Sequence, residues 1–191
     1  MEAYLPNYCY RDALLTPEAI VIHYFSCINV QPKDPYDLQS NWNLMHDLNA
    51  FKSDRQWFLN KHGDPTGRMY ASAHCLIGRD GKKMLTVPED KQAYHAGISH
   101  YNDRSNWNTF SYGIELIGSA SSGFTDAQYA ACANHCYTLM DEYNIDLNML
   151  VGHEDISPGR KVDPGIATGN FDMEKLKHQI GQVAFYSENG S

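Results

Sequence analysis

Three side chains able to bind a metal ion stand at the ends of predicted elements or in a turn-rich loop of this 191-residue chain. His23 lies near the end of the apolar run Ala19–Phe25, His153 follows "NMLVG", and Asp163 lies in the loop "EDISPGRKVDPG". A hydrolytic zinc site uses three ligands of these types and leaves a fourth position for water. Each residue alone also has a plain structural explanation: a buried, hydrogen-bonded histidine for His23, and a turn or cap for Asp163.

Glu115 is the acidic residue of the otherwise apolar run "TFSYGIELIG". In a strand, Phe110, Tyr112, Ile114 and Leu116 would share one face, so Glu115 is expected on the other face. An unpaired carboxylate is costly to bury, and a nearby cation is the usual compensation. A carboxylate placed beside a metal ion can accept the proton of an activated water.

The elements that must position these residues follow from the hydrophobic pattern. Ala19–Phe25 is predicted to be a central strand, and "NMLVGH" a second short strand. Asp80-Gly81 joins the two apolar runs of "ASAHCLIGRDGKKMLTVP", which predicts an antiparallel hairpin. The following connection, "PEDKQAYHAG", is predicted to be helical or irregular.

Three segments have helical patterns. Residues 37–60 predict one helix or two short ones, ended by "KHGDPTG". Thr125 and Gln128 have the spacing of a capping box. The amphipathic helix that follows should bury Tyr129, Cys132, Ala133, Cys136, Leu139, Met140 and Tyr143. "DMEKLKHQIGQVAFY" predicts a closing helix. Together these elements predict an α/β fold, a single domain with a mixed central β-sheet flanked by α-helices.

Composition limits the partners of the chain. A net charge of -8 argues against binding to nucleic acid, which needs a surplus of Lys and Arg on at least one face. The opening "MEAYLPNYCYRDALLTPEA" has neither the basic start nor the apolar run of a secretory signal, and no run is long enough to span a membrane. Five cysteines without CxxC spacing indicate free thiols. We therefore expect a cytoplasmic protein without nucleic-acid or membrane partners, of unknown oligomeric state.

Six motifs across about residues 19–180 carry a family resemblance. They are "IVIHYF", "SAHCLIGRDG", "YHAG", "SYGIELIG", "FTDAQY" and "GHEDISPGRKVDPG". In this order and spacing they resemble the zinc-dependent N-acetylmuramoyl-L-alanine amidases of type 2. Within that family the chain is most similar to the cytosolic branch that recycles anhydro-muropeptides, and then to phage endolysin amidases. Peptidoglycan recognition proteins are similar too. The resemblance implies a single amidase domain over residues 1–191.

Position by position, the resemblance implies roles for five residues. One zinc ion would be bound by His23, His153 and Asp163. Glu115 would be the catalytic acid/base, and Lys161 would assist at the oxyanion.

Two further histidines lie in these motifs. His95 of "YHAG" is a candidate substrate-binding residue, which could line the cleft or pack beneath it. Many relatives have tryptophan where this chain has Tyr94, so the wall of the cleft is less firmly predicted than the metal site. His74 is expected to be structural.

The resemblance implies hydrolysis of the amide bond between the lactyl group of N-acetylmuramic acid and L-alanine of the stem peptide. Soluble 1,6-anhydromuropeptides are the favoured substrate, since an acidic protein is less suited to anionic wall polymers. An endolysin acting on intact peptidoglycan and a non-catalytic recognition domain are the alternatives, although such recognition domains lack part of the zinc set. A zinc peptidase is disfavoured because the chain has no HExxH motif.

The loop from His153 to Asp163 must fold back for both residues to reach one ion. Turn geometry is available from Pro158, Gly159, Pro164 and Gly165. We expect Asp155 and Arg160 to pin this loop and Glu154 to be solvated. The segment 30–67 is expected to form one rim of the cleft.

Overall fold

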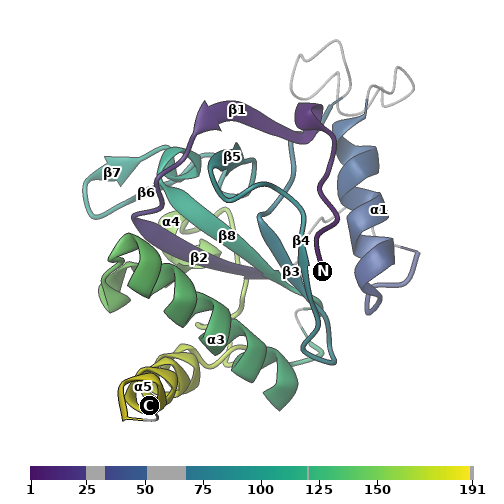
Figure 1. Cartoon of the computed structure of the whole chain (residues 1–191). Helices are drawn as coiled ribbons and strands as arrows, with labels where there is room; N and C mark the ends of the chain where they lie inside the picture. The colour runs from purple at the N-terminus through teal and green to yellow at the C-terminus, as the bar shows by residue number, and fades with distance from the viewer. Residues whose placement is uncertain (25–32, 51–67, 120, 190–191) are drawn as a thin grey trace.

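The computed structural model describes residues 1–24, 33–50, 68–119 and 121–189. Its centre is a five-stranded sheet of order β4-β3-β8-β2-β9 (Figure 1). β2 (Ala19–Tyr24) lies parallel to β8 (Ser111–Leu116) on one side and to β9 (Leu150–Gly152) on the other. β3 (Cys75–Ile77) is parallel to β8 and forms the predicted hairpin with β4 (Lys83–Leu85). The sheet is therefore mixed, as expected.

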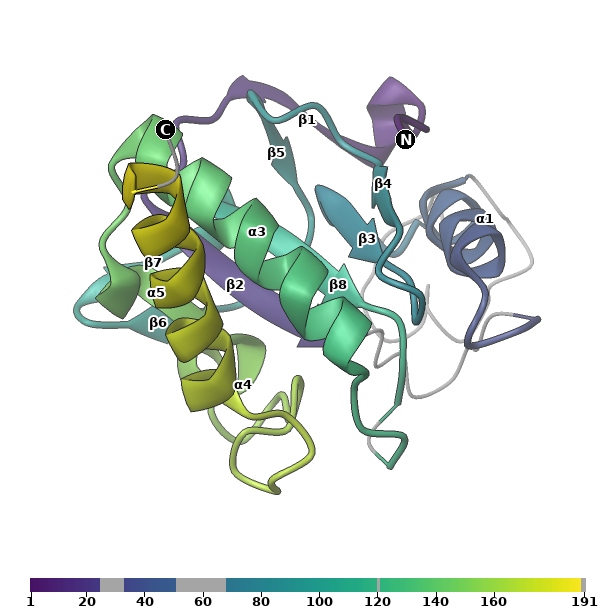
Figure 2. The same cartoon turned by 60° about the horizontal axis from the view of Figure 1, so that its bottom comes forward.

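Two helices cover one face of this sheet (Figure 2). α3 (Asp126–Tyr143) begins at Thr125 with the predicted capping box, and α5 (Met173–Asn189) packs against it. Between these helices and the sheet lies the largest apolar cluster, to which β2 and β8 contribute Ile20, Ile22, Tyr112, Ile114 and Leu116. Burial of apolar area stabilises the fold by about 25 cal/mol per Å², so this layer contributes to stability.

The opposite face is covered by several smaller elements. α1 (Leu38–Asn49) packs beside β3 and β4 and shares an apolar cluster with them. β1 (Tyr10–Leu14) pairs with β5 (Lys91–Ala93) in a two-stranded antiparallel sheet. β6 (His100–Tyr101) and β7 (Arg104–Ser105) form a small hairpin.

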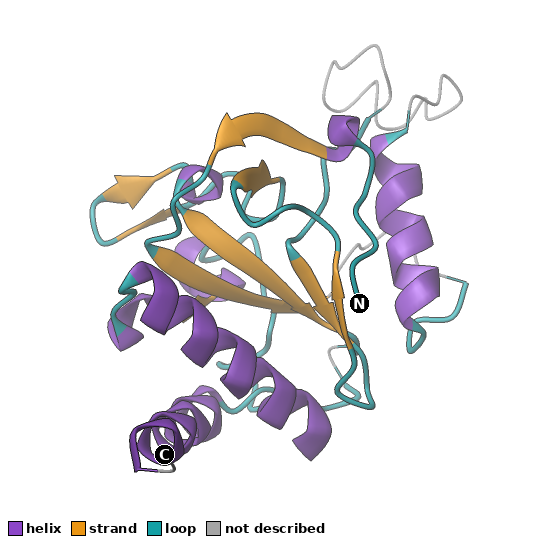
Figure 3. Cartoon of the chain, in the orientation of Figure 1, coloured by secondary structure: helices purple, strands orange, loops and turns teal. Residues whose placement is uncertain are grey.

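Short helical turns, purple in Figure 3, complete the described chain. They are η1 (Asn7–Cys9), η2 (Trp107–Thr109), η3 (Leu147–Met149) and α4 (His153–Ile156). No helix in the described ranges is long and apolar enough to cross a bilayer.

Three sequence predictions differ from the structure. "PEDKQAYHAG" contains the strand β5 rather than a helical or irregular connection, because β1 offers it a pairing edge that no local pattern shows. Phe110 does not join the face of Tyr112; it follows η2 and packs with Trp107 and Val151 on the other side. The loop after His153 starts with the helical turn α4. Residues 51–60 of the predicted first helix lie outside the described residues.

The free-thiol prediction is confirmed for the cysteines that the structure describes. Cys9, Cys75, Cys132 and Cys136 are free and buried. Cys132 and Cys136 lie in the apolar cluster beneath α3, where they act as small apolar side chains. Cys27 lies outside the described residues.

Candidate metal centre

His23, His153 and Asp163 meet at one buried point, as the sequence predicts. His23 lies in β2, His153 begins α4 directly after β9, and Asp163 comes from the following loop. The two Nδ1 atoms are 2.9 Å apart, and Asp163 Oδ2 lies 3.2 Å from Nδ1 of His23 and 3.0 Å from Nδ1 of His153. Adjacent parallel strands thus deliver two imidazoles to the same edge, and the loop adds the carboxylate.

The chemistry and spacing of this donor set suit a divalent metal ion. Ligand atoms about 2.0–2.1 Å from a tetrahedral zinc lie about 3.3 Å from one another, close to the observed separations. Two imidazole nitrogens and a carboxylate oxygen also suit zinc and similar first-row ions. All three residues are buried, and their ligand atoms lie within 4.8 Å of one another. The described residues therefore form a site that can hold a metal ion.

The electrostatics of the cluster favour the metal-binding protonation states. Burial, followed by the neighbouring charge of His153, lowers the pKa of His23 to about 4, so its ring is neutral near pH 7. For Asp163, burial alone would raise the pKa. Contact with the His153 and His23 rings outweighs this effect and holds the pKa of Asp163 below its usual range. A neutral His23 beside the Asp163 carboxylate leaves a buried negative charge that a cation can balance.

Glu115 lies beside His23 on the same face of the sheet, because the two are register partners in β8 and β2. Its Oε2 is shielded from solvent and has no hydrogen-bond partner among the described residues. Burial, and then the charge of Asp163, raises the pKa of Glu115 to about 8, whereas the charge of Lys161 opposes this rise. Glu115 can therefore exchange a proton near neutral pH, and Lys161 acts on it electrostatically.

The loop between His153 and Asp163 is pinned as expected by Asp155 and Arg160. Asp155 Oδ2 accepts the N–H of Gly152 at 2.7 Å, just before His153. Arg160 Nη2 donates to the carbonyl oxygens of Ala96 and Ile98, at 2.7 Å in each case. The loop turns through Gly159 and Gly165, which have φ of +75° and +92°.

The expectation that Glu154 is solvated is wrong. Its carboxylate accepts the N–H groups of Gly165 at 3.0 Å, Ile166 at 2.5 Å and Ala167 at 3.3 Å. The turn after Asp163 points three successive N–H groups at one place, and a carboxylate can satisfy all of them. Glu154 therefore fixes the far side of the turn that carries Asp163.

His95 and His74 lie behind the metal-binding cluster. His95 is 8% exposed, with Nδ1 3.0 Å from His23 Nε2 and Nε2 3.1 Å from the Ser111 carbonyl. Burial, and then His23, keeps the pKa of His95 well below its usual value. His74 accepts the N–H of Gly113 at 2.9 Å and lies 2.9 Å from the Lys91 carbonyl, which confirms its structural role.

Sequence reasoning missed the backbone groups around the cluster. Ala96 O lies 3.0 Å from His153 Nε2, and Asn108 Oδ1 accepts the N–H groups of His95 and Ala96. Neither contact leaves a pattern of residue types. One signal was present: Gly113 interrupts a strand, and such glycines often mark close packing. A Cβ at Gly113 would lie 2.5 Å from Cγ of His95.

A hollow of about 920 Å³ adjoins the His95 segment. Its lining includes Arg11, Tyr70, Tyr94, Ile98 and Asn108. The rings of Tyr70 and Tyr94 make an edge contact at 5.2 Å, and the guanidinium of Arg11 lies 6.0 Å from the Tyr94 ring. The hollow thus combines apolar faces with a positive charge.

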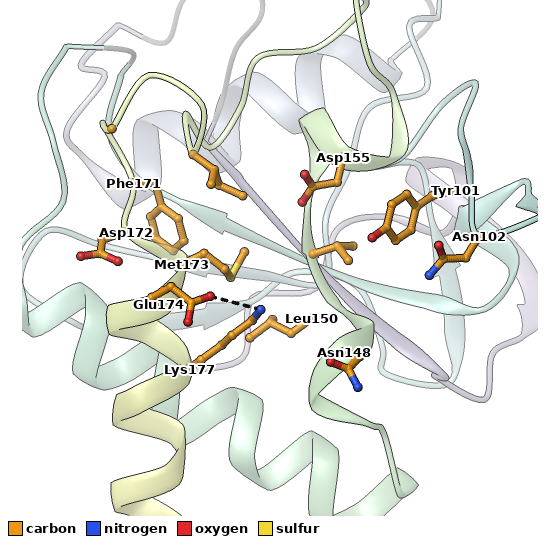
Figure 4. A pocket seen from close by; sticks show the side chains of 13 residues that line it. Tyr101, Asn102, Asn148, Leu150, Asp155, Phe171, Asp172, Met173, Glu174 and Lys177 are labelled. Carbon is orange, nitrogen blue, oxygen red and sulfur yellow. Dashed lines mark hydrogen bonds and ion pairs between the residues drawn. The ribbon is translucent and has the colours of Figure 1, made fainter.

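A second hollow of about 600 Å³ lies between β9 and the start of α5 (Figure 4). Its charged side chains have local structural roles. Asp155 binds Gly152, Asp172 accepts the N–H of Lys175 at 2.9 Å, and Glu174 and Lys177 pair at 3.5 Å. These contacts fix the start of α5 and the end of β9. The residues of the metal-binding cluster do not line this hollow.

Known proteins share both the sequence and this architecture. The profile of the N-acetylmuramoyl-L-alanine amidase family matches residues 13–166. The 1,6-anhydro-N-acetylmuramyl-L-alanine amidase AmpD of Escherichia coli strain K12 is 50% identical over 106 residues, which are 56% of this chain and 56% of the relative. The chain thus spans little more than half the length of the curated relatives it matches.

Two solved structures resemble the whole described fold. The crystal structure of a selenomethionine derivative of AmpD has a TM-score of 0.69 at 32% identity, covering 94% of this chain and 93% of that one. The amidase AmiD from Escherichia coli, in complex with anhydro-N-acetylmuramic acid-L-Ala-D-gamma-Glu-L-Lys, has a TM-score of 0.61 at 26% identity, covering 88% and 59%. With the family profile matching most of its length, this chain belongs to the N-acetylmuramoyl-L-alanine amidase family.

Proposed function

We propose that this chain is a zinc-dependent amidase, a single catalytic domain over residues 1–191, that cleaves between the lactyl group of N-acetylmuramic acid and the L-alanine of the stem peptide. The observation that supports it most is the convergence of His23, His153 and Asp163 within 4.8 Å, with Glu115 next to His23 on the same face. A recognition domain without catalysis would not need a shielded carboxylate with a raised pKa at this point.

The residues have distinct parts in this reaction. His23, His153 and Asp163 would hold zinc, which supplies a Lewis acid for the amide carbonyl and lowers the pKa of water. Glu115 takes a proton from the attacking water and returns it to the nitrogen of L-alanine as the C–N bond breaks. Lys161 places a positive charge beside the oxyanion that forms on the carbonyl oxygen. The products are a lactyl carboxylate and a peptide with a free amine.

Soluble 1,6-anhydromuropeptide is the proposed substrate. AmpD, the relative at 50% identity, is named for this linkage, and the AmiD complex contains an anhydromuramyl peptide. The hollow beside His95 offers tyrosine rings for a sugar or aliphatic group and Arg11 for a peptide carboxylate. Of the two roles expected for His95, its burial and the contacts of both ring nitrogens favour packing beneath the cleft over contact with substrate. A cytoplasmic location belongs to the same proposal.

The test compares 1,6-anhydromuropeptide with intact sacculi, each with and without a zinc chelator, and measures the release of free peptide by mass spectrometry. We expect turnover of the soluble substrate, its loss with chelator, and its recovery on addition of zinc. Turnover of sacculi at an equal or higher rate would favour an endolysin instead. Binding of either substrate without peptide release would favour a recognition domain, and chelator-resistant release would contradict the zinc site.

A further inference from the structure

Both histidines of the cluster point their second ring nitrogen at one dipeptide, His95–Ala96. His23 Nε2 lies 3.0 Å from Nδ1 of His95, and His153 Nε2 lies 3.0 Å from the carbonyl oxygen of Ala96. In metal sites, the group bonded to the far nitrogen of a histidine fixes its tautomer and the direction of its ring. Here the consecutive residues His95 and Ala96 contact the far nitrogens of His23 and His153.

The tautomers of this network follow from the carbonyl groups at its ends. A carbonyl oxygen only accepts, so the 3.1 Å contact to Ser111 O requires the hydrogen of His95 on Nε2. His95 Nδ1 is then an acceptor, and His23 must donate to it from Nε2. The lone pair of His23 Nδ1 is thereby left to face the cluster, in the form that binds a metal ion.

The same logic holds for His153. The carbonyl oxygen of Ala96 accepts from His153 Nε2 at 3.0 Å, and it also accepts from Arg160 Nη2 at 2.7 Å. Its two lone pairs allow both bonds. With its hydrogen on Nε2, His153 would direct the lone pair of Nδ1 at Asp163 and His23. The donor Arg160 Nη2 lies 3.3 Å from His153 Nε2, farther than the 3.0 Å to the Ala96 oxygen.

One side chain holds the dipeptide in place. Asn108 Oδ1 accepts the N–H of His95 at 3.1 Å and that of Ala96 at 2.7 Å. Asn108 lies in η2, which is anchored by the fully buried Trp107. Gly113 supports the other side, since any Cβ there would collide with the His95 ring. Asn108 touches none of the three ligands itself.

We propose that Asn108 is a positioning residue for the metal centre, which clamps His95–Ala96 so that this dipeptide sets the tautomer and aim of both ligand histidines. The role of Asn108 rests on the proposed zinc site and extends it beyond the ligands. In characterised sites, loss of a group bonded directly to a ligand costs about 10- to 100-fold in metal affinity. Asn108 holds two such groups, His95 and Ala96, so we expect an effect in the same range.

The test compares Asn108→Ala, Asn108→Asp and wild type by zinc affinity, measured by competition with a chromogenic chelator. Alanine removes the acceptor and should weaken zinc binding about 10- to 100-fold. Aspartate keeps an acceptor oxygen and should restore affinity close to that of wild type. The absorption spectrum of the Co²⁺-substituted protein should change in Asn108→Ala and not in Asn108→Asp. Asn134→Ala, an exposed asparagine of α3, is the matched control and should change neither measurement.

A purely structural role for Asn108 predicts a different pattern. Asn108→Ala would then lower the melting temperature of the metal-free protein while zinc affinity and the Co²⁺ spectrum stayed at wild-type values, and this result would overturn the proposal. An equal loss in Asn108→Asp and Asn108→Ala would overturn it too. If the wild type binds zinc and the Asn108 variants bind it equally well, the role of Asn108 is overturned and the proposed function stands. If the wild type binds no zinc, both the role of Asn108 and the proposed function are overturned.

A measurement on the wild type keeps the proposal testable if Asn108→Ala does not fold. ¹⁵N NMR of the histidine rings in the zinc-loaded protein should show His23, His95 and His153 with hydrogen on Nε2. A hydrogen on Nδ1 of His95 would break the relay from Ser111 to His23 and contradict the assignment.

Discussion

β2 and β8 present two different faces built from alternate residues of the same strands. The helix face consists of Ile20, Ile22, Tyr112, Ile114 and Leu116, packed beneath α3 and α5. The site face, at the positions between them, consists of Val21, His23, Ser111, Gly113 and Glu115. The side chains of the helix face are large, apolar and buried, whereas those of the site face, apart from the apolar Val21, are small or polar.

The two faces of this one sheet therefore have different roles: the helix face stabilises the fold, and the site face carries the residues proposed for the chemistry. On the helix face, each side chain removes apolar area from water. On the site face, Gly113 leaves room for the His95 ring, and Glu115 keeps a shielded oxygen without a hydrogen bond among the described residues. A change on the helix face should therefore lower stability and leave turnover per folded molecule intact, whereas a change on the site face should act most strongly on turnover.

The largest effect is expected for Glu115→Gln on the site face. Glutamine keeps the shape of the side chain and removes its ability to exchange a proton, so kcat should fall by about 10²- to 10⁴-fold. Zinc content and fold should be retained, because Glu115 is not among the clustered ligand atoms. Glu142→Gln on α3 is the control, with wild-type turnover expected. Undiminished peptide release by Glu115→Gln would remove Glu115 from the mechanism and blur the distinction between the faces.

Ile22→Ala tests the helix face one position before His23. Ile22 is fully buried, and the lost methyl groups plus the remaining cavity should lower the free energy of unfolding by about 3 kcal/mol. Turnover per folded molecule at low temperature should match that of wild type. Urea denaturation gives the first value and initial rates give the second. Leu14→Ala, at a residue 78% exposed on β1, should change neither by much. A fall in kcat without loss of stability would show that the two faces are coupled.

The contrast between the faces explains what the sequence could predict. The strands β2 and β8, the hairpin at Asp80-Gly81 and the capped helix α3 follow from local patterns, since an apolar face against helices leaves a periodic trace. The proposed metal-binding residues His23, His153 and Asp163 were assigned through the family resemblance, because each of them alone also had a plain structural explanation. In contrast, β1 with β5 and the contacts of Glu154 depend on backbone groups far apart in sequence, which leave no such trace.

Zinc should stabilise the protein through the site face alone. With zinc at 100-fold excess over its dissociation constant, the free energy of unfolding should rise by about 2.7 kcal/mol, because the ion binds only the folded cluster. Thermal unfolding with zinc and with chelator measures this difference. Asp163→Asn weakens one ligand and should abolish most of this zinc-dependent stabilisation. Ile22→Ala should keep the full zinc-dependent stabilisation, although its free energy of unfolding is lower both with and without zinc. An unchanged shift in Asp163→Asn would place the stabilising ion outside this cluster.

The smallest effect is expected from the titration of Glu115 in the metal-free protein. Burial raises its pKa in the folded state to about 8, above the ordinary value of 4.5 that applies when the chain is unfolded. Between these values the unfolded chain releases the proton while the folded chain keeps it, so stability is lost as the pH rises from 4.5 to 8. One pH unit is worth at most 1.36 kcal/mol, and access of water reduces the sum, so we expect a loss of about 2 kcal/mol.

Glu115→Gln isolates this contribution, because glutamine does not titrate and the histidines remain in both proteins. The stability of wild type relative to Glu115→Gln, from urea denaturation at pH 5.5 and 8.5 with chelator present, should be lower at the higher pH. Lys161→Met removes the charge that opposes the rise, so the pKa of Glu115 should move further upward. A constant difference between wild type and Glu115→Gln at both pH values would mean that Glu115 is solvated as readily as an ordinary surface carboxylate. Burial of Glu115 on the site face would then not lower the free energy of unfolding.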